Sequence, residues 1–242
     1  MTDKKDNNRK ESSNRIQTSF LNAMEKKALV WMAERLPSWV SSDQMTFLGL
    51  FGAFLTGAGF ALTNFGPAWF WLASFGLVIN WVGDSLDGTI ARVRQQPRPL
   101  YGFYIDHNLD AVCQLLIFGG AGLSPYLNLS FALLALVVYL MMEIYVMICA
   151  HLKNEFKLTY GKLGPTEFRA IIIFINTVFY FSDSIREWHV DFSIVSEKMV
   201  ICSFDVVCLF IFALLLVLYL DSMLRDARYF AKIDPLPRKK DN

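Results

Sequence analysis

The chain has 242 residues, of which 54% are hydrophobic, and its formal net charge is +1. This composition argues against an ordinary soluble domain, and the balanced charge gives no sign of nucleic acid as a partner. The apolar residues fall into blocks that approach the roughly 20 residues a helix needs to cross a bilayer. We therefore expect an integral membrane protein.

The chain begins with a polar, basic stretch that has no apolar core of the kind found in signal peptides. We expect residues 1–22 to be a disordered cytoplasmic lead. Residues 23–40 mix apolar side chains with Lys and Arg and include Trp31 and Trp39. This mixture is typical of an amphipathic helix that lies in the membrane interface, and a soluble linker helix is the alternative.

Six apolar blocks follow, and each predicts a transmembrane helix. They cover residues 45–62, 68–82, 103–122, 129–150, 168–181 and 199–220. The second helix would continue to Ala91 only with its polar end in contact with water or protein. The expected fold class is all-α: an N-terminal interfacial helix and six transmembrane helices, within a single membrane domain over residues 23–232. A basic cytoplasmic tail would cover residues 233–242.

The connections between the blocks differ in charge. The lead, the connections after the second and fourth blocks, and the tail are rich in Lys and Arg, whereas the other connections are neutral or acidic. By the positive-inside rule, both termini and the connection that carries Arg92, Arg94 and Arg98 lie in the cytoplasm.

Acidic residues recur on both sides of the connection between the second and third blocks. The sequence D-S-L-D-G-T-I-A-R runs from Asp84 to Arg92, and G-F-Y-I-D-H-N-L-D runs from Gly102 to Asp110. Successive helical residues are about 100° apart, so each run places its special residues on one helix face. The first face comprises Asp84, Asp87, Gly88 and Ala91, and the second comprises Gly102, Asp106 and Asp110. If the two faces meet, four carboxylates surround one cavity.

Four like charges at membrane depth are unfavourable, and hard divalent cations are the simplest means of neutralising them. Carboxylate oxygens suit Mg²⁺ or Mn²⁺, and a pair of such ions suits displacement at phosphorus. The small residues Gly88, Ala91 and Gly102 would leave room for a nucleotide diphosphate. Arg92 would bind phosphate, or it would extend to the membrane surface as an anchor.

This pattern resembles the signature of the CDP-alcohol phosphotransferase family, D-x-x-D-G-x-x-A-R, a short spacer, then G-x-x-x-D-x-x-x-D, and every specified position matches. The resemblance implies that Asp84, Asp87 and Asp106 bind two metal ions. It also implies that Asp110 completes the metal site and acts as general base on the acceptor hydroxyl, with CMP as the leaving group. The CDP group would contact Asp84, Gly88, Ala91, Arg92 and Gly102, and a homodimer would fit the family.

Other residues allow two interpretations. The segment from Gly164 to Arg169 is typical of a helix start, but Arg169 with Lys157 or Lys162 could form a basic pocket for the phosphate of an acceptor. Glu143 and Asp205 are either functional carboxylates or helix–helix contacts. His107 points about 100° away from the acidic face, which favours a packing role.

The resemblance implies an enzyme of phospholipid biosynthesis that transfers a phosphatidyl group from CDP-diacylglycerol to a small hydroxyl acceptor. The alternative is transfer of a phosphoalcohol from CDP-choline or CDP-ethanolamine to diacylglycerol. A cation or proton transporter is a distant third, because a transporter has no need for Gly, Ala and Arg at these offsets. Residues 40–46 depart from the family pattern, in which Pro-Asn often precedes the Thr that is Thr46 here.

Overall fold

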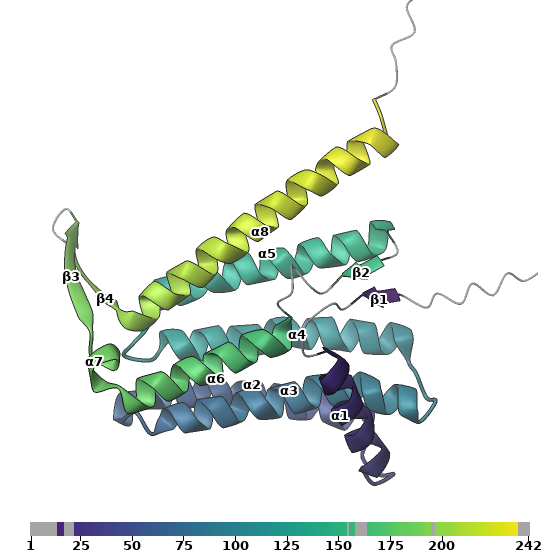
Figure 1. The fold of residues 1–242 in the computed structure, drawn as a ribbon, viewed down its shortest axis with the longest axis horizontal. Helices are drawn as coiled ribbons and strands as arrows, with labels where there is room; N and C mark the ends of the chain where they lie inside the picture. Colours follow the sequence, from purple (N-terminus) through teal and green to yellow (C-terminus); the bar gives the residue numbers. More distant parts are fainter. Residues whose placement is uncertain (1–13, 17–21, 154, 158–163, 195–196, 237–242) are drawn as a thin grey trace, which may run out of the picture.

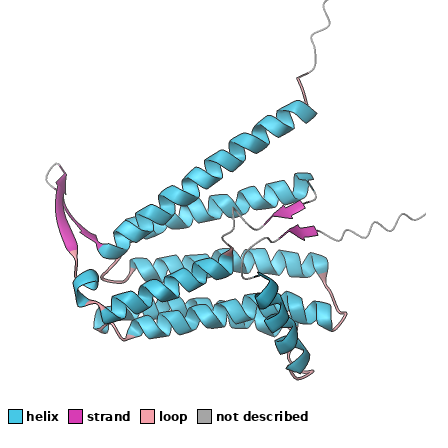
Figure 2. Ribbon diagram, in the orientation of Figure 1, coloured by secondary structure: helices cyan, strands magenta, loops and turns pink. Residues whose placement is uncertain are grey.

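The structure is a computed structural model that describes residues 14–16, 22–153, 155–157, 164–194 and 197–236. Six long helices run back and forth in a bundle, and a shorter helix, α1 (Asn22–Arg35), crosses one end of it (Figure 1). The six are α2 (Ser42–Leu62), α3 (Trp69–Val93), α4 (Pro99–Gly122), α5 (Leu129–Lys153), α6 (Pro165–Phe181) and α8 (Ser203–Ile233). Helix accounts for most of the described chain (Figure 2).

The six long helices correspond to the six apolar blocks, and most of them extend into polar sequence at one end. Helix α2 begins three residues before its block, where the Ser41 hydroxyl accepts a hydrogen bond from the Gln44 amide and the Gln44 side chain accepts one from the Ser41 amide. Helix α4 begins at Pro99, whose fixed φ and missing N–H suit a first helical position. Helix α3 continues to Val93, as the positions of its aspartates required.

Short strands occur where none was predicted. Strands β3 (His189–Ile194) and β4 (Glu197–Cys202) form an antiparallel hairpin after the short helix α7 (Asp183–Arg186). The prediction that the last helix begins at residue 199 was therefore wrong. Helix α8 begins at Ser203 because the Asp205 carboxylate accepts a hydrogen bond from the Cys202 amide and so caps the helix there.

A second pair of strands involves the predicted lead. Strand β1 (Asn14–Ile16) pairs in parallel with β2 (Glu155–Lys157), which follows α5. These three residues of the lead have a paired backbone where we expected disorder. Residues 1–13 and 17–21 lie outside the described part of the chain, as do residues 237–242 of the predicted tail.

Helices α2 and α3 pack with their backbones in contact. A β-carbon added at Gly52 would lie 2.3 Å from the Asn80 backbone nitrogen, and one added at Gly83 would lie 2.2 Å from the Gly49 nitrogen. Small residues allow such close approach between membrane helices, where van der Waals packing is the main source of association. This contact fixes the acidic end of α3 against the start of α2.

We call the end of the bundle that carries α1 and the starts of α2, α4 and α6 the site end, and the opposite end, with the β3–β4 strands, the hairpin end. The core at the hairpin end is aromatic. It is formed by Phe60, Phe70, Tyr126, Phe179 and Phe204, whose rings stack or meet edge to face. Asp205, which is fully buried, joins this core to the loop before α5 by accepting two hydrogen bonds from Asn128, from its amide at 2.7 Å and its side chain at 2.6 Å.

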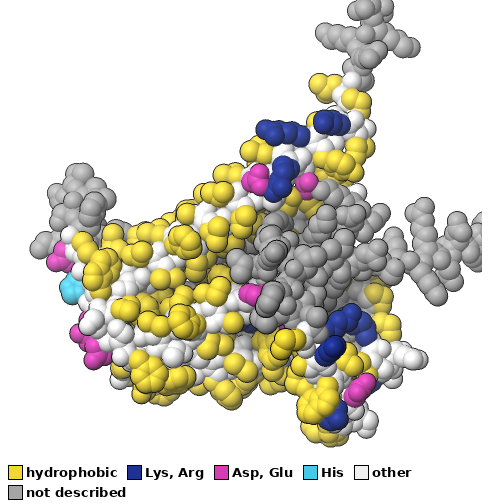
Figure 3. Space-filling view, in the orientation of Figure 1, with side chains coloured by type: hydrophobic (Ala, Val, Ile, Leu, Met, Phe, Trp, Pro, Cys, Tyr) yellow, Lys and Arg dark blue, Asp and Glu magenta, His cyan; other side chains and the backbone are white. Residues whose placement is uncertain are grey.

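Three helices of the described chain are long and apolar enough to cross a membrane, within Ser42–Phe65, Leu129–Leu152 and Ser203–Ile233. Helices α3 and α4 each carry two of the aspartates, and α6 has 17 residues. Hydrophobic side chains cover the sides of the bundle, and charged ones gather towards its two ends (Figure 3). The structure thus describes a helical membrane protein, while the count of six spans stays a prediction.

The predicted N-terminal helix forms but ends at Arg35 rather than at residue 40. Its inner face buries Leu29 and Ala33 against Leu86 and Ile90 of α3. The turn after it is held by the Arg94 guanidinium, which donates hydrogen bonds to backbone carbonyls of residues 36–38 and 40. Its position in the membrane interface stays a prediction.

Candidate functional site

Three aspartates from two helices converge at the site end. Asp84 of α3 and Asp106 and Asp110 of α4 each have a carboxylate oxygen, and these three oxygens lie within 4.8 Å of one another. All three residues are half-buried. The predicted meeting of the two acidic faces is therefore what the structure shows, and oxygen atoms at this spacing can share a divalent cation.

Asp87 faces the same cavity and is held by α2. Its Oδ2 accepts a hydrogen bond from the Thr46 hydroxyl at 2.9 Å, and its other carboxylate oxygen accepts one from the Gly88 amide. The Ser42 hydroxyl donates to the Asp87 backbone carbonyl at 2.8 Å. Two side chains from the first turns of α2 thus fix both the backbone and the carboxylate of Asp87.

The four aspartates surround a small cavity of about 10 Å³. That is close to the volume a single water molecule needs, so the cavity suits an ion better than any larger group. A nucleotide would have to lie outside it, against the open ends of α3 and α4. Its lining is formed by Thr46, Gly49, Leu50, Asn80, Asp84, Asp87, Asp106, Leu109, Asp110 and Cys113.

Arg169 of α6 reaches the same cluster. Its Nη2 lies 2.7 Å from Asp84 Oδ2, and its Nε donates a hydrogen bond to Asn80 Oδ1 at 3.1 Å. The Asn80 side chain in turn donates to the Gly49 carbonyl at 2.9 Å. The Arg169 side chain is only 16% exposed, so its charge acts in a partly desolvated setting where ion pairs are strong.

The other two members of the predicted basic pocket are not placed beside Arg169. Lys162 lies outside the described residues, and Lys157 belongs to strand β2, of which only the backbone is described. The segment before Arg169 does start a helix, with Pro165 in the first turn and the Glu167 carboxylate accepting the Gly164 amide at 2.9 Å. The helix-start interpretation is therefore confirmed, whereas a basic pocket for the phosphate of an acceptor stays a prediction.

Of the residues predicted to contact the nucleotide, Asp84 lines the cavity, whereas Gly88, Ala91, Arg92 and Gly102 do not. A β-carbon added at Gly102 would meet no atom within 4 Å, and one added at Gly88 would meet only the Arg92 side chain, at 3.4 Å. Arg92 is exposed and donates a hydrogen bond to the Thr89 hydroxyl at 3.0 Å. Ala91 is half-buried. The open space beside these residues is where a ligand could approach the backbone.

The three remaining candidate residues lie in different places: Glu143 is near the site, whereas His107 and Asp205 make structural contacts. Glu143 of α5 is half-buried and near enough to Asp110 for the two carboxylates to repel each other. The His107 ring lies over the Phe103 ring at 4.1 Å and hydrogen-bonds to the Phe103 carbonyl at 2.9 Å, which agrees with packing. Asp205 caps α8 at the hairpin end and takes no part in the site.

Thr46 and Asn80 are members of the site that were not predicted. Thr46 lies outside the aspartate motif, and the residues before it depart from the family pattern, so it was not selected. Asn80 is a buried polar residue in an apolar block, four residues before Asp84 and thus on the same helix face. Two features of the sequence could have identified Asn80: its spacing to Asp84 and its polar side chain within an apolar block. A buried polar side chain in such a block requires a hydrogen-bonding partner.

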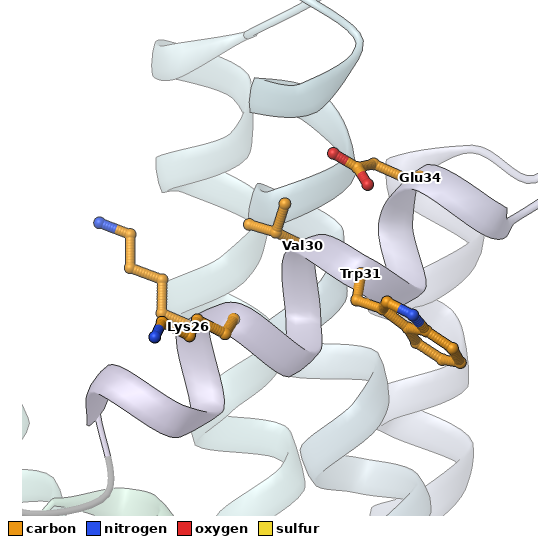
Figure 4. Close-up of a pocket in the computed structure, with 5 residues that line it drawn as sticks. Lys26, Val30, Trp31 and Glu34 are labelled. Atoms are coloured by element: carbon orange, nitrogen blue, oxygen red, sulfur yellow. The ribbon is translucent and has the colours of Figure 1, made fainter.

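A larger hollow lies elsewhere, along the outer side of α1. It has a volume of about 520 Å³ and is lined by Lys26, Lys27, Val30, Trp31 and Glu34 (Figure 4). None of the four aspartates borders it, and its width and exposure make it a surface groove.

Comparison with known proteins identifies the family. The family model for CDP-alcohol phosphatidyltransferases matches residues 36–202, which include α2 to α6 and all four aspartates. The chain belongs to the CDP-alcohol phosphatidyltransferase family. It is also 27% identical to bovine (Bos taurus) cholinephosphotransferase 1 over 159 residues. That alignment covers 62% of this chain and 38% of the relative, so the chain spans well under half the length of this curated relative.

For this CDP-alcohol phosphatidyltransferase family member, the matched segment and the site coincide. Every residue that lines the small cavity, and Arg169 beside it, falls inside residues 36–202. Helices α1 and α8 lie entirely outside the match.

Proposed function

We propose that this chain is a divalent-metal-dependent transferase of phospholipid biosynthesis that moves a phosphatidyl group from CDP-diacylglycerol to a small hydroxyl acceptor. The observation that carries the proposal is the cavity on which four aspartates converge, with the Arg169 guanidinium beside it. Four carboxylates bring an excess of negative charge together in a half-buried place. Such an excess is strongly unfavourable unless cations neutralise it.

The donor set suits the metal that the family implies. Every candidate ligand is a carboxylate oxygen, which matches Mg²⁺ or Mn²⁺ and not the thiolate- or imidazole-rich sites of softer metals. The cavity as it stands has room for one ion between Asp84, Asp87, Asp106 and Asp110, and the second ion that the family implies would require these carboxylates to move apart. The bound ions would neutralise the donor diphosphate and stabilise the CMP leaving group.

The reaction then requires one proton acceptor. Asp110 would take the proton from the acceptor hydroxyl, and the resulting oxygen would attack the phosphorus distal to cytidine. A new P–O bond forms to the acceptor while the P–O bond to CMP breaks. Phosphoryl chemistry of this kind depends on positioning and charge neutralisation, both of which the fixed carboxylates provide.

The donor would lie over the open ends of α3 and α4. Gly88 and Gly102 leave room beside the backbone there, and Arg92 is a cation within one helical turn of Gly88. A planar guanidinium suits phosphate oxygens, so Arg92 would bind the diphosphate. Arg169, on the other side of Asp84, would receive the phosphate of an acceptor such as a phosphorylated alcohol.

Transfer of a phosphoalcohol from CDP-choline or CDP-ethanolamine to diacylglycerol is the second candidate. Its support is the similarity to bovine cholinephosphotransferase 1, together with the D-H pair at Asp106 and His107. In this reaction the attacking hydroxyl belongs to the lipid, and Asp110 would keep the same role.

The proposal includes a membrane orientation. All six long helices would cross the bilayer, and α1 would lie in the interface with Trp31 and its lysines at the headgroups (Figure 4). The site end and both termini would face the cytoplasm, where the basic connections lie. Membrane lipids would surround the bundle, and a homodimer stays a prediction.

Release of CMP is the decisive assay. The protein would be purified into lipid nanodiscs and supplied with CDP-diacylglycerol or CDP-choline, each with a panel of hydroxyl acceptors. We expect CMP release with one donor class, loss of release with EDTA, and recovery with excess Mg²⁺ or Mn²⁺. Cation or proton flux in liposomes without any CMP release would contradict the transferase proposal and favour a transporter.

A further inference from the structure

Glu25 links α1 to both helices that carry the Arg169–Asp84 ion pair. Its Oε1 accepts a hydrogen bond from the Trp81 indole nitrogen of α3 at 2.8 Å and from the Thr166 hydroxyl of α6 at 2.9 Å. Figure 1 shows the start of α6 beside α1. One carboxylate oxygen therefore joins three helices at the site end.

The two residues that Glu25 holds are each three positions from a member of the ion pair. Trp81 precedes Asp84 on α3, and Thr166 precedes Arg169 on α6. Residues three apart lie within the same helical turn, so a shift at either contact moves the charged group with it. The Asp84–Arg169 distance is 2.7 Å, a spacing that does not tolerate movement of about 1 Å without losing the pair.

Side chains hold the first turn of α6 in place. A helix start leaves four amides without intrahelical partners, and here the Glu167 side chain satisfies the Gly164 amide just before the helix. Thr166 is bonded to Glu25, and Arg169 is bonded to Asn80 and Asp84. The Glu25 contact thus connects this turn to α1.

We propose that Glu25 is a positioning residue that holds the first turn of α6 against α3 and thereby sets Arg169 beside Asp84. Only the expected effect of Glu25 on substrate affinity rests on the proposed function; the structural role of Glu25 does not. It gives α1, which lies entirely outside the segment matched by the family model, a direct part in shaping the site. Loss of the contact would lower the affinity for phosphate-bearing substrates and leave the carboxylates in place.

The variants separate hydrogen bonding from side-chain bulk. Glu25→Ala and Thr166→Val remove the contact, whereas Glu25→Gln and Thr166→Ser keep an acceptor or a hydroxyl in place. Glu34→Ala is the matched control, because Glu34 is an exposed glutamate on the outer side of the same helix (Figure 4).

The first readout is independent of activity. Hydrogen–deuterium exchange of the purified protein in nanodiscs should be at least about threefold faster in α6 peptides covering residues 169–173 for Glu25→Ala and Thr166→Val. Glu25→Gln, Thr166→Ser and Glu34→Ala should match the parent protein. Unchanged exchange in Glu25→Ala would overturn the proposal, whether or not the chain proves to be a transferase.

The second readout is a double-mutant cycle with Arg169→Gln in the CMP-release assay. We expect Glu25→Ala to raise the KM for the phosphate-bearing substrate about fivefold with kcat within about twofold of the parent, and to add nothing to Arg169→Gln. If the effects of Glu25→Ala and Arg169→Gln on KM multiply in the double variant, Glu25 does not act through Arg169 and the proposal is wrong. A parent protein that turns over no CDP donor would refute the proposed function alone, because the exchange data would still decide the role of Glu25.

Discussion

At the scale of single residues, the site depends on side chains that hold other side chains. Thr46 holds the Asp87 carboxylate, and Asn80 holds Arg169 while its amide is bonded to the Gly49 carbonyl. A carboxylate that binds a cation must be oriented before the ion arrives, since each side chain fixed beforehand reduces the entropy lost on binding. We therefore expect the supporting hydroxyl and amide to affect activity, although neither would contact the reacting phosphorus.

Asp110→Asn tests the assignment of the general base. Loss of the proton acceptor should lower kcat by about a hundredfold or more. The amide is nearly the same size as the acid, so the thermal melting of the variant should stay close to that of the parent. CMP release and melting measured on the same preparation would check this, and turnover above a tenth of the parent rate would count against the assignment.

Asp84→Asn tests the metal assignment separately from catalysis. Removing one anionic ligand should weaken Mn²⁺ binding about tenfold or more, measured by the loss of the free-ion electron paramagnetic resonance signal. Asp205→Asn is the matched control, since this buried aspartate lies at the hairpin end. Equal Mn²⁺ affinity in the two variants would argue against an ion at Asp84.

Thr46→Val should reduce activity even though it leaves every carboxylate in place. The 2.9 Å hydrogen bond to Asp87 is lost while the side-chain shape is kept, and a bond to a charged group contributes about 1.5–3 kcal/mol. We expect the apparent Mg²⁺ requirement of CMP release to rise by about tenfold. Thr46→Ser, which keeps the hydroxyl, should behave as the parent does, and equal metal requirements for the two variants would contradict the positioning role.

At the scale of helices, the register between α2 and α3 determines where Asp84 and Asp87 lie. The register depends on backbone contact at Gly52 and Gly83, where no side chain could be inserted without moving a helix. The small residues of α3 thus fall into two kinds. Gly83 makes a helix contact, whereas Gly88 faces open space next to Arg92.

Gly52→Ala and Gly88→Ala should separate these two kinds by experiment. The added methyl at position 52 would overlap the Asn80 backbone, and overpacking of this kind destabilises by about 1–3 kcal/mol. Its melting temperature should fall by several degrees. The added methyl at position 88 should leave melting unchanged and weaken CDP-donor binding instead, which titration of a labelled donor would show. The reverse pattern would contradict both assignments.

At the scale of the whole molecule, the two ends of the bundle differ in the side chains that they bring together. The site end gathers four carboxylates and their supporting residues, while the hairpin end closes the bundle with an aromatic core and the capping carboxylate of Asp205. The close α2–α3 contact runs between them. Disturbance at the hairpin end should therefore change stability more than chemistry.

Asp205→Ala makes that separation measurable. Three hydrogen bonds to Asn128 and Cys202 would be lost from a fully buried position, at an expected cost on the order of 3 kcal/mol. The fraction of folded protein and the melting temperature should drop, while kcat per folded molecule stays within about twofold of the parent. A large loss of kcat in the folded fraction would show that the two ends are coupled.

What could be predicted from sequence alone were the features that repeat with helical periodicity or stand at fixed spacing. Apolar blocks predicted the six long helices because burial in lipid or protein acts on every residue of a block. The four aspartates and their common cavity were predicted because positions three and four apart share a helix face, as in Asp84 with Asp87 and Asp106 with Asp110. The family followed from the same spacing.

Only the tertiary structure decided the contacts between residues far apart in the chain. The Thr46–Asp87, Arg169–Asp84 and Glu25–Thr166 pairs are separated by 41, 85 and 141 residues, and no local pattern specifies which helices meet at those points. The β3–β4 hairpin, by contrast, is local in the chain, and it was missed because residues 199–202 were assigned to the last apolar block and so to a helix. Helix formation follows from the composition of a segment, whereas these contacts exist only once the bundle has packed.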